Sequence, residues 1–344
     1  MTDTTDEGTP SPMVDDTTAP TLRDRARGAM AGLAIGDAIG RPVEGLSAAE
    51  IQAQYGRVTG YLNDTPAGSD DTEYALLTAK TILRAGTGAT RDDFAQSWIE
   101  DVLPQADGFA GGGFSEMAAI DNLRRGLRPP LSGDHIHSWS DGLAMRVAPI
   151  GIAANGDLAL ATRLAIEDGV VSHSGEGVHC GVAVAVAVTA AMGGADADEA
   201  FAAALAAVPA DSWIARNLTD GRELVRSISD QDTLAIALHD RLAIVDYYWA
   251  DIAPEATALA LCAVIAGRGD FTDSTLFAVN LGRDADTIAA MAGCVAGAIS
   301  GVDAIPRDWL DGLRPVEGSC IRSMAGIHPL DTADQLVDQL EATR

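Results

Sequence analysis

The chain has 344 residues, 47% of them hydrophobic, so it is long enough and apolar enough to bury a sizeable core. Asp and Glu number 50 against 23 Lys and Arg, and the formal net charge of −27 would repel nucleic-acid phosphates, which argues against DNA or RNA as a partner. The sequence shows neither a signal peptide nor a run of about 18 apolar residues that could span a bilayer. We therefore expect a cytoplasmic protein with no membrane partner.

The first 21 residues differ in composition from the rest of the chain. They are rich in Thr, Asp and Pro and contain almost nothing apolar, so they cannot bury enough surface to offset the entropy lost on ordering. Residues 1–21 are therefore predicted to form a disordered acidic tail. No long Pro/Ser linker divides residues 22–344, which are expected to form one domain.

Alanine-rich segments recur along this domain, at 181–192, 199–208, 256–266 and 288–299. Because Ala has the highest helix propensity, these segments predict helices. Residues 181–188 alternate Val and Ala with the period of a strand, but small side chains all round suit a helix buried among others. Loops rich in Gly, Pro, Asp and Ser are expected at 60–71, 106–115, 126–142 and 267–287. The sequence thus predicts an all-α fold.

Glycines recur at a spacing of four residues along the last of these predicted helices and just beyond segment 288–299, at Gly293, Gly297 and Gly301. Gly inside a helix costs roughly 1 kcal/mol relative to Ala, so the run requires a reason. The close approach of a neighbouring backbone is the usual one, and we expect it here.

Three acidic motifs lie at predicted loop or helix boundaries: GDAIGRPVE (36–44), SDDT (69–72) and DADT (284–287). Either of the last two alone is best explained as a helix N-cap, whose side-chain oxygen accepts a free backbone N–H. Together they offer more oxygens than two caps need, whereas Mg²⁺ takes about six oxygen ligands and Mn²⁺ a similar set. If Glu44 and the four aspartates of the last two motifs converge, two divalent cations would nearly cancel their charge.

Five segments of the chain resemble the motifs of the ADP-ribosylglycohydrolase family, in the family order and between about residues 25 and 302. They are GAMAGLAIGDAIGRPVE (28–44), SDDTEYALLTAKTIL (69–83), DGLAMRVAPIG (141–151), SHSGEGVHCG (172–181) and VNLGRDADTIAAMAGCVAGAISG (279–301). The resemblance implies an orthogonal multi-helix single domain with two Mg²⁺ ions, or Mn²⁺, at the base of a cleft.

The resemblance also implies a reaction, in which an activated water attacks ribose C1 and releases the group attached there. Glu44 corresponds to a family glutamate that takes part in catalysis, and Asp71 is the alternative general base. The expected substrate is an ADP-ribosylated protein or an ADP-ribosyl small molecule. The implied metal ligands are Ser69, Asp70, Asp71, Asp284, Asp286 and Thr287.

Further segments are expected to contact the substrate. Backbone N–H groups of residues 111–115 could cradle a diphosphate, although a flexible Gly-rich turn explains the segment equally well; the resemblance favours the diphosphate. His173 and Glu176 either reach the substrate or order neighbouring loops, and for a lone His the structural role is favoured. The expected substrate-binding residues are Gly111, Gly112, Gly113, Phe114, Ser115, Asp141, Gly142, Met145, His173 and Arg283.

This chain departs from the family pattern at several positions. Arg283 replaces the usual Gly, Asp141 replaces the usual Asn, and Glu73 and Tyr74 replace a neutral pair. Ser69 replaces Thr but keeps the ligand oxygen. These changes affect the substrate-facing wall more than the metal ligands.

Three alternative functions remain open at this point. The same reaction could act on a smaller ribosyl compound, such as a nucleoside or a ribosylated metabolite, and the changes at Asp141 and Arg283 would suit that. A non-catalytic nucleotide-binding protein is a second alternative, although an intact set of oxygen ligands argues against it. A two-metal phosphohydrolase is the third.

Overall fold

The alanine-rich segments form helices in the computed structural model, which describes residues 19–105 and 112–342. The four segments correspond to α8 (Glu176–Met192), α9 (Ala197–Ala207), α12 (Ala253–Ala266) and α14 (Ala285–Ser300). Within the described ranges there is no β-strand, and β-type pairing is limited to one isolated bridge between Ser47 and Gly282. The all-α prediction is confirmed.

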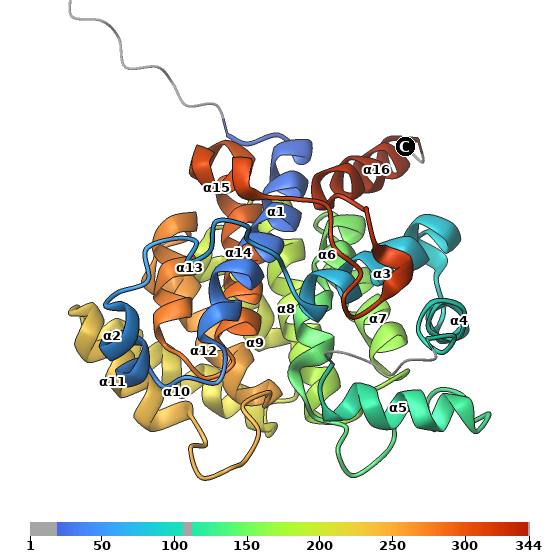
Figure 1. Cartoon of the computed structure of the whole chain (residues 1–344), viewed down its shortest axis with the longest axis horizontal. Helices are drawn as coiled ribbons and strands as arrows, with labels where there is room; N and C mark the ends of the chain where they lie inside the picture. The colour runs from blue at the N-terminus through green and yellow to red at the C-terminus, as the bar shows by residue number, and fades with distance from the viewer. Residues whose placement is uncertain (1–18, 106–111, 343–344) are drawn as a thin grey trace, which may run out of the picture.

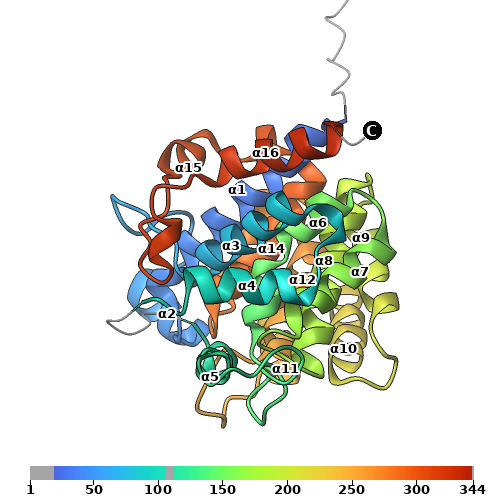
Figure 2. The same ribbon diagram turned by 90° about the vertical axis from the view of Figure 1, so that its right-hand side faces the viewer.

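The remaining helices surround a central pair formed by α1 and α14, with α13 on one flank and α3 and α6 on the other (Figure 1). The turned view shows α16 lying across α1, and α4 outside α3 (Figure 2). The α-helices not yet given are α1 (Leu22–Gly40), α2 (Ala48–Tyr55), α3 (Asp70–Ala85), α4 (Arg91–Asp101), α5 (Phe114–Arg124), α6 (Ala148–Ala154), α7 (Leu158–Gly169), α10 (Trp213–Ser227), α11 (Gln231–Leu242), α13 (Phe271–Asn280), α15 (Arg307–Gly312) and α16 (Pro329–Ala342). Short 3-10 helices are η1 (Arg41–Val43), η2 (Gly86–Gly88), η3 (Asp141–Arg146), η4 (Val302–Ala304) and η5 (Arg322–Met324).

The alternating segment 181–188 is helical because it is buried on every side. It occupies the middle of α8, and each of its residues is buried. A helix of Val and Ala presents no bulky face, so α6, α7, α9 and α14 can all pack against it. The two-residue period therefore reflects uniform burial rather than a strand.

The expected loop 267–287 is wrong over its middle part, which forms α13. Asp270 caps this helix by accepting the Asp273 N–H, and Phe271 and Phe277 are buried. Of the polar residues that favoured a loop, Asp270 supplies the cap and Asp273 is exposed, whereas Ser274 and Thr275 are buried within the short helix.

Helices α1 and α14 pack antiparallel with their backbones in direct contact. A Cβ added to Gly28 would lie 2.1 Å from the carbonyl oxygen of Gly297, and one added to Gly32 would lie 2.1 Å from that of Gly293. Such distances leave no room for any side chain, so the expected close backbone approach is confirmed. Gly301 differs from the other two, because it follows α14 as its C-cap with φ 79°.

The same contact continues to the end of the helix pair and positions the acidic residues. A Cβ on Gly40, the last residue of α1, would lie 2.4 Å from the Cα of Asp286 in the first turn of α14. The end of α1 and the start of α14 therefore meet, and the acidic motif of α14 is brought against the GDAIG motif of α1.

Among the helices of the described residues, none is long and apolar enough to cross a membrane. The four cysteines, Cys180, Cys262, Cys294 and Cys320, are all free and buried.

The glycine contact predicts a large effect of adding one methyl group. Gly293→Ala would force α1 and α14 apart, so we expect it to lower the free energy of unfolding by about 1–3 kcal/mol, the usual cost of overpacking. Gly88→Ala is the matched control, since a Cβ at Gly88 meets nothing within 4 Å, and it should change stability by less than about 0.5 kcal/mol. Urea unfolding measures both variants. Equal stability of the two would contradict the packing described here.

Candidate metal centre and substrate cavity

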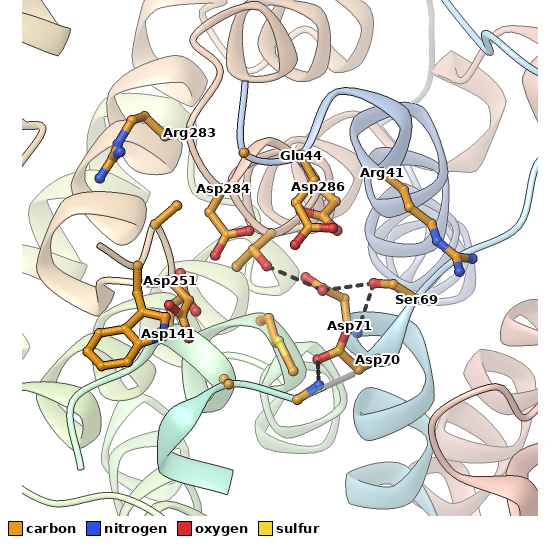
Figure 3. A pocket seen from close by; sticks show the side chains of 18 of the residues that line it. Arg41, Glu44, Ser69, Asp70, Asp71, Asp141, Asp251, Arg283, Asp284 and Asp286 are labelled. Carbon is orange, nitrogen blue, oxygen red and sulfur yellow. Dashed lines mark hydrogen bonds between the residues drawn. The ribbon is translucent and has the colours of Figure 1, made fainter. Parts of the chain in front are cut away.

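A cavity of about 620 Å³ opens where α1, α3 and α14 meet, and several acidic side chains are among the residues that line it (Figure 3). Those side chains come from five separate parts of the chain, namely the loop after α1, the start of α3, the start of η3, the loop before α12 and the start of α14. The carboxylates are Glu44, Asp70, Asp71, Asp141, Asp251, Asp284 and Asp286. The fold thus collects the acidic motifs into one site.

A short backbone pairing brings the Glu44 loop beside the α14 motif. The N–H of Gly45 donates to the carbonyl of Arg283 at 2.8 Å, and the N–H of Arg283 donates to the carbonyl of Leu46 at 2.8 Å. A Cβ on Gly282 would lie 2.4 Å from the Leu46 carbonyl oxygen. The backbone of Gly282 also has φ 72°, a conformation that favours glycine. As a result, carboxylate oxygens of Glu44, Asp284 and Asp286 lie within 4.8 Å of one another.

Asp284 stands at the N-cap of α14 but makes no capping hydrogen bond. Asp157, Asp196, Asp230 and Asp270 occupy the same position on other helices, and each of them accepts a backbone N–H of its own first turn. The capping explanation of the DADT motif therefore does not account for Asp284, whose carboxylate is directed into the cavity (Figure 3).

The first turn of α3 is held against α1 by Asp37. The Asp37 carboxylate is fully buried and accepts the N–H groups of Ser69 and Thr72 and the Thr72 hydroxyl. Ser69 Oγ and Thr287 Oγ1 lie 3.1 and 3.3 Å from the same oxygen of Asp71. Oxygens of Asp37, Asp71 and Asp286 form a second group within 4.8 Å, so Asp286 belongs to both clusters.

The cluster carries more negative charge than its surroundings can balance. Burial, and then neighbouring carboxylates, raise the pKa of Asp71 and of Asp286 well above the usual range. Burial above all raises the pKa of Asp37 to about 6, although hydrogen bonds from Thr72 and Ser69 oppose the shift. Asp71 Oδ1 and Asp286 Oδ1 are buried without a hydrogen-bond partner. Buried carboxylate oxygens of this kind require a proton or a cation.

The donor set fits a hard divalent cation. All the groups that converge are carboxylate or hydroxyl oxygens, which Mg²⁺ and Mn²⁺ prefer, and no thiol or imidazole lines the described part of the cavity. The structure brings together all six residues expected to be metal ligands, and Glu44 with them.

The described part of the Gly-rich segment lies at the cavity wall, but two of its N–H groups are already engaged. The N–H of Gly112 donates to Asp70 at 2.8 Å, and that of Phe114 donates to Asp251. Gly112 and Gly113 line the cavity, whereas Ser115 is buried and donates to the His137 carbonyl. Phe114 packs its ring on His137, Trp139 and Trp249. Gly111 lies outside the described residues.

Only some of the residues expected to bind the substrate line the cavity. Asp141, Gly142 and Met145 line it, while His173 is 1% exposed and sits behind it. The imidazole of His173 hydrogen-bonds to Ser140 and Ser172. The Glu176 carboxylate accepts the N–H groups of Trp213 and Ile214 at the start of α10. Both residues therefore order neighbouring segments.

Arg283 lines the cavity, but its charge is neutralised. Nε of Arg283 lies 2.5 Å from Oε1 of the buried Glu255, and the guanidinium is directed away from the acidic cluster (Figure 3). Arg283 has φ 64°, in the left-handed region where glycine is favoured. Glu255 also accepts the Ile244 N–H, so this ion pair anchors the loop between α11 and α12.

Sequence reasoning missed several residues of the site. Asp37 belonged to a quoted motif, but its burial at the meeting point of three helices depends on the α1–α14 contact. Asp251 and Trp249 lie on a loop without a recognisable motif, although the aromatic run that ends at Trp249, two residues before Asp251, is notable in a chain with few aromatic residues. Glu73, noted above only as a departure, is buried and accepts the N–H groups of Ser319, Cys320 and Ile321.

Comparison with known proteins places this site in context. A family model described as ADP-ribosylglycohydrolase matches residues 18–342. An uncharacterized protein of Archaeoglobus fulgidus is 34% identical over 86% of this chain and 93% of its own length. The ADP-ribosylarginine hydrolase Tri1 of Pseudomonas putida is 29% identical over 84% of this chain and 74% of its own. A solved structure, the ADP-ribosylglycohydrolase-related protein complex, is 27% identical, with a TM-score of 0.62 over 92% of this chain and 98% of that one.

The raised pKa values predict how stability depends on pH and Mg²⁺. A carboxylate whose folded pKa is raised stabilises the fold below its unfolded pKa of about 4, and this contribution is lost as pH rises through the folded value, which is about 6 for Asp37. Mg²⁺ binds the ionised carboxylates, so it should raise the Tm more at about pH 8 than at about pH 5. Thermal unfolding with and without MgCl₂ measures the difference.

The control for this experiment separates the site from the general surface charge. Asp286→Asn removes the carboxylate shared by both clusters and should abolish most of the Mg²⁺-dependent rise in Tm. Asp303→Asn removes an exposed carboxylate far from the cavity and should leave that rise unchanged. A rise in Tm that is the same at both pH values, or in both variants, would contradict a metal site at Asp286.

Proposed function

Since the chain belongs to the ADP-ribosylglycohydrolase family and is a glycosidase-type hydrolase, we propose that it hydrolyses the bond between ribose C1 and the attached group in ADP-ribosylated molecules, with divalent cations bound in the acidic cavity. The observation that carries the proposal is the convergence of the SDDT and DADT motifs on buried carboxylate oxygens that lack partners. Neither a helix cap nor a surface charge explains them.

The cations would be Mg²⁺ or Mn²⁺, and we propose two of them. Asp286, which belongs to both carboxylate groups, would help to hold the ions, with Ser69, Asp70, Asp71, Asp284 and Thr287 as the other ligands. When bound, the ions would neutralise the carboxylates, orient the ribose hydroxyls and lower the pKa of water.

Glu44 is the stronger candidate for the general base. It is the exposed member of its carboxylate group, so water and substrate can reach it, whereas Asp71 is 1% exposed and accepts hydrogen bonds from two hydroxyls. Partial desolvation at the cavity wall and the charge of Asp70 raise the pKa of Glu44, which strengthens it as a base. The water oxygen would form a bond to C1 as its proton passes to Glu44 and the bond from C1 to the leaving group breaks.

A second candidate function keeps the reaction and replaces the substrate with a smaller ribosyl compound. The favouring observation is that Asp70 and Asp251 already accept the N–H groups of Gly112 and Phe114. A diphosphate would have to displace these carboxylates, and both arginines of the cavity are engaged elsewhere, Arg41 with the carbonyl of Gly68 and Arg283 with Glu255.

Substitutions at Glu44 and Asp71 should separate catalysis from metal binding. We expect Glu44→Gln to lower kcat by about 10²- to 10⁴-fold, as for loss of a general base, and to keep the Mg²⁺-dependent rise in Tm. Asp71→Asn should lose both the catalytic activity and the Mg²⁺-dependent rise in Tm. Glu223→Gln, on an exposed part of α10, is the matched control and should behave like the wild type. Full activity of Glu44→Gln would assign the base elsewhere.

The two substrate classes can be separated directly. With Mg²⁺ present, release of ADP-ribose from ADP-ribosylated protein is compared with release of ribose from nucleosides. We expect activity on the ADP-ribosylated protein. Activity confined to nucleosides would replace the first proposal by the second, and release of phosphate alone would identify a phosphohydrolase.

A further inference from the structure

One buried carboxylate near the cavity has no part in the proposed reaction. Glu116 lies in the first turn of α5 and is 0% exposed. A Cβ added to Gly142 would lie 2.0 Å from its Oε1, and a Cβ added to Gly113 would lie 3.1 Å from its Oε2. Gly113 and Gly142 both line the cavity, so the Glu116 carboxylate lies directly behind the cavity wall at these two glycines.

Glu116 shares a buried arginine with a second carboxylate. Nη1 of Arg146 lies 3.4 Å from Oε1 of Glu116 and donates to the carbonyl of Gly142 at 2.9 Å. The same guanidinium donates to Asp168 through Nε and Nη2. Because one cation faces two carboxylates, it compensates neither of them fully, and burial raises the pKa of Glu116 to about 7 although the charge of Arg146 opposes the shift. The ionised form of Glu116 therefore depends on further hydrogen-bond donors.

Ser140 and His173 supply these donors. Oγ of Ser140 donates to Oε2 of Glu116 at 3.1 Å and lies 3.1 Å from Nε2 of His173. Since the hydroxyl proton of Ser140 is used, Nε2 of His173 must carry a hydrogen and donate it to Ser140 Oγ. Nε2 also lies 3.4 Å from Oε1 of Glu116, which is a second acceptor. The geometry therefore selects the tautomer of His173 with its hydrogen on Nε2.

The contacts of the other ring nitrogen agree with this tautomer. Burial, and then the charge of Arg146, lower the pKa of His173 well below its usual range, so the ring is neutral and one of its nitrogens accepts. Nδ1 lies 2.7 Å from Oγ of Ser172, which accepts from Nη2 of Arg146 at 3.1 Å and donates its own proton to Nδ1. The donors therefore all point one way, along a chain of Arg146, Ser172, His173, Ser140 and Glu116.

We propose that Glu116 is a positioning residue for the proposed hydrolysis, because its carboxylate is the terminal acceptor of this chain and holds the start of η3, at Ser140 and Gly142, in place behind the cavity. This inference rests on the proposed function. A substrate that meets a wall already held in place loses less freedom on binding. Among the described residues, none of the proposed metal ligands hydrogen-bonds to Glu116. Loss of the carboxylate should therefore weaken substrate binding and leave the metal site intact.

The first test reads the direction of the chain from the tautomer of His173. Gln keeps the shape of Glu, but either orientation of its amide places an N–H group against another donor, Ser140 on one side or Arg146 and His173 on the other. The conflict at Ser140 is relieved if the hydrogen of His173 moves to Nδ1. Long-range ¹H–¹⁵N NMR of protein labelled with ¹⁵N-histidine, at about pH 8 where Glu116 is ionised, distinguishes the two tautomers.

We expect the Nε2–H tautomer of His173 in the wild type and the Nδ1–H tautomer in Glu116→Gln. The signal of His173 is identified by its loss in His173→Gln. The same tautomer in the wild type and in Glu116→Gln would overturn the proposal, because Glu116 would then not set the direction of the chain.

The second test measures KM and kcat with Mg²⁺ present, on the compound that the wild type hydrolyses, ADP-ribosylated protein or nucleoside. Glu116→Gln should raise KM about 10-fold or more, the effect of losing hydrogen bonds to a charged group, and should change kcat by less than about threefold. Glu116→Asp keeps the charge and should recover part of the loss. Asp121→Asn, an exposed carboxylate on the same helix, is the matched control and should behave like the wild type.

The remaining outcomes separate this inference from the proposed function. Glu116→Gln should keep the Mg²⁺-dependent rise in Tm, and loss of that rise would show a general structural role instead. If Glu116→Gln does not fold, Ser140→Ala breaks the chain one step earlier and should also raise KM. Unchanged KM in the variant would leave the proposed function standing and remove the positioning role. Absence of any hydrolysis by the wild type would defeat the proposed function, while the tautomer of His173 would still test the chain.

Discussion

The contact between the backbones of α1 and α14 is the constraint on which the site depends. Glycines on both helices remove the side chains that normally separate two helices, and the contact continues from Gly28 to Gly40. Because the helices run antiparallel, their register alone decides which residue of α1 faces which residue of α14. The end of α1 and the start of α14 therefore meet at a defined place, with Asp37 and Asp286 on the two sides of the junction.

This rigid junction holds together groups that repel one another. Several carboxylates are buried within a few ångströms, and their raised pKa values reflect both lost hydration and mutual repulsion. Folding energy from the alanine-rich core offsets this repulsion. The arrangement is suited to an oxygen-ligand cation site, in which the free energy of cation binding repays part of the cost of assembling the ligands.

Composition was enough to predict much of the fold, but it was less informative about where the acidic motifs lie. Alanine content was sufficient to predict α8, α9, α12 and α14, because propensity and burial favour the same structure there. The prediction from composition failed for α13, because its polar residues favour a loop when their packing in the fold is not known. The glycine spacing predicted a close backbone contact but not its partner, although Gly28, Gly32, Gly36 and Gly40 repeat the same spacing in α1. The sequence could not predict that Asp251 and Trp249 line the cavity, since their position depends on the ion pair of Arg283 with Glu255.

The buried carboxylate of Glu73 connects the C-terminal part of the chain to the acidic cavity. Glu73 lies in the same helical turn as Asp70 and Asp71, and it accepts three successive backbone N–H groups, from Ser319 to Ile321. Ser319 itself lines the cavity. The segment around Ser319 is therefore a structural component of the acidic cavity. If it detached, the buried carboxylate of Glu73 would lose its hydrogen-bond donors in the same helical turn as Asp70 and Asp71, which are proposed metal ligands.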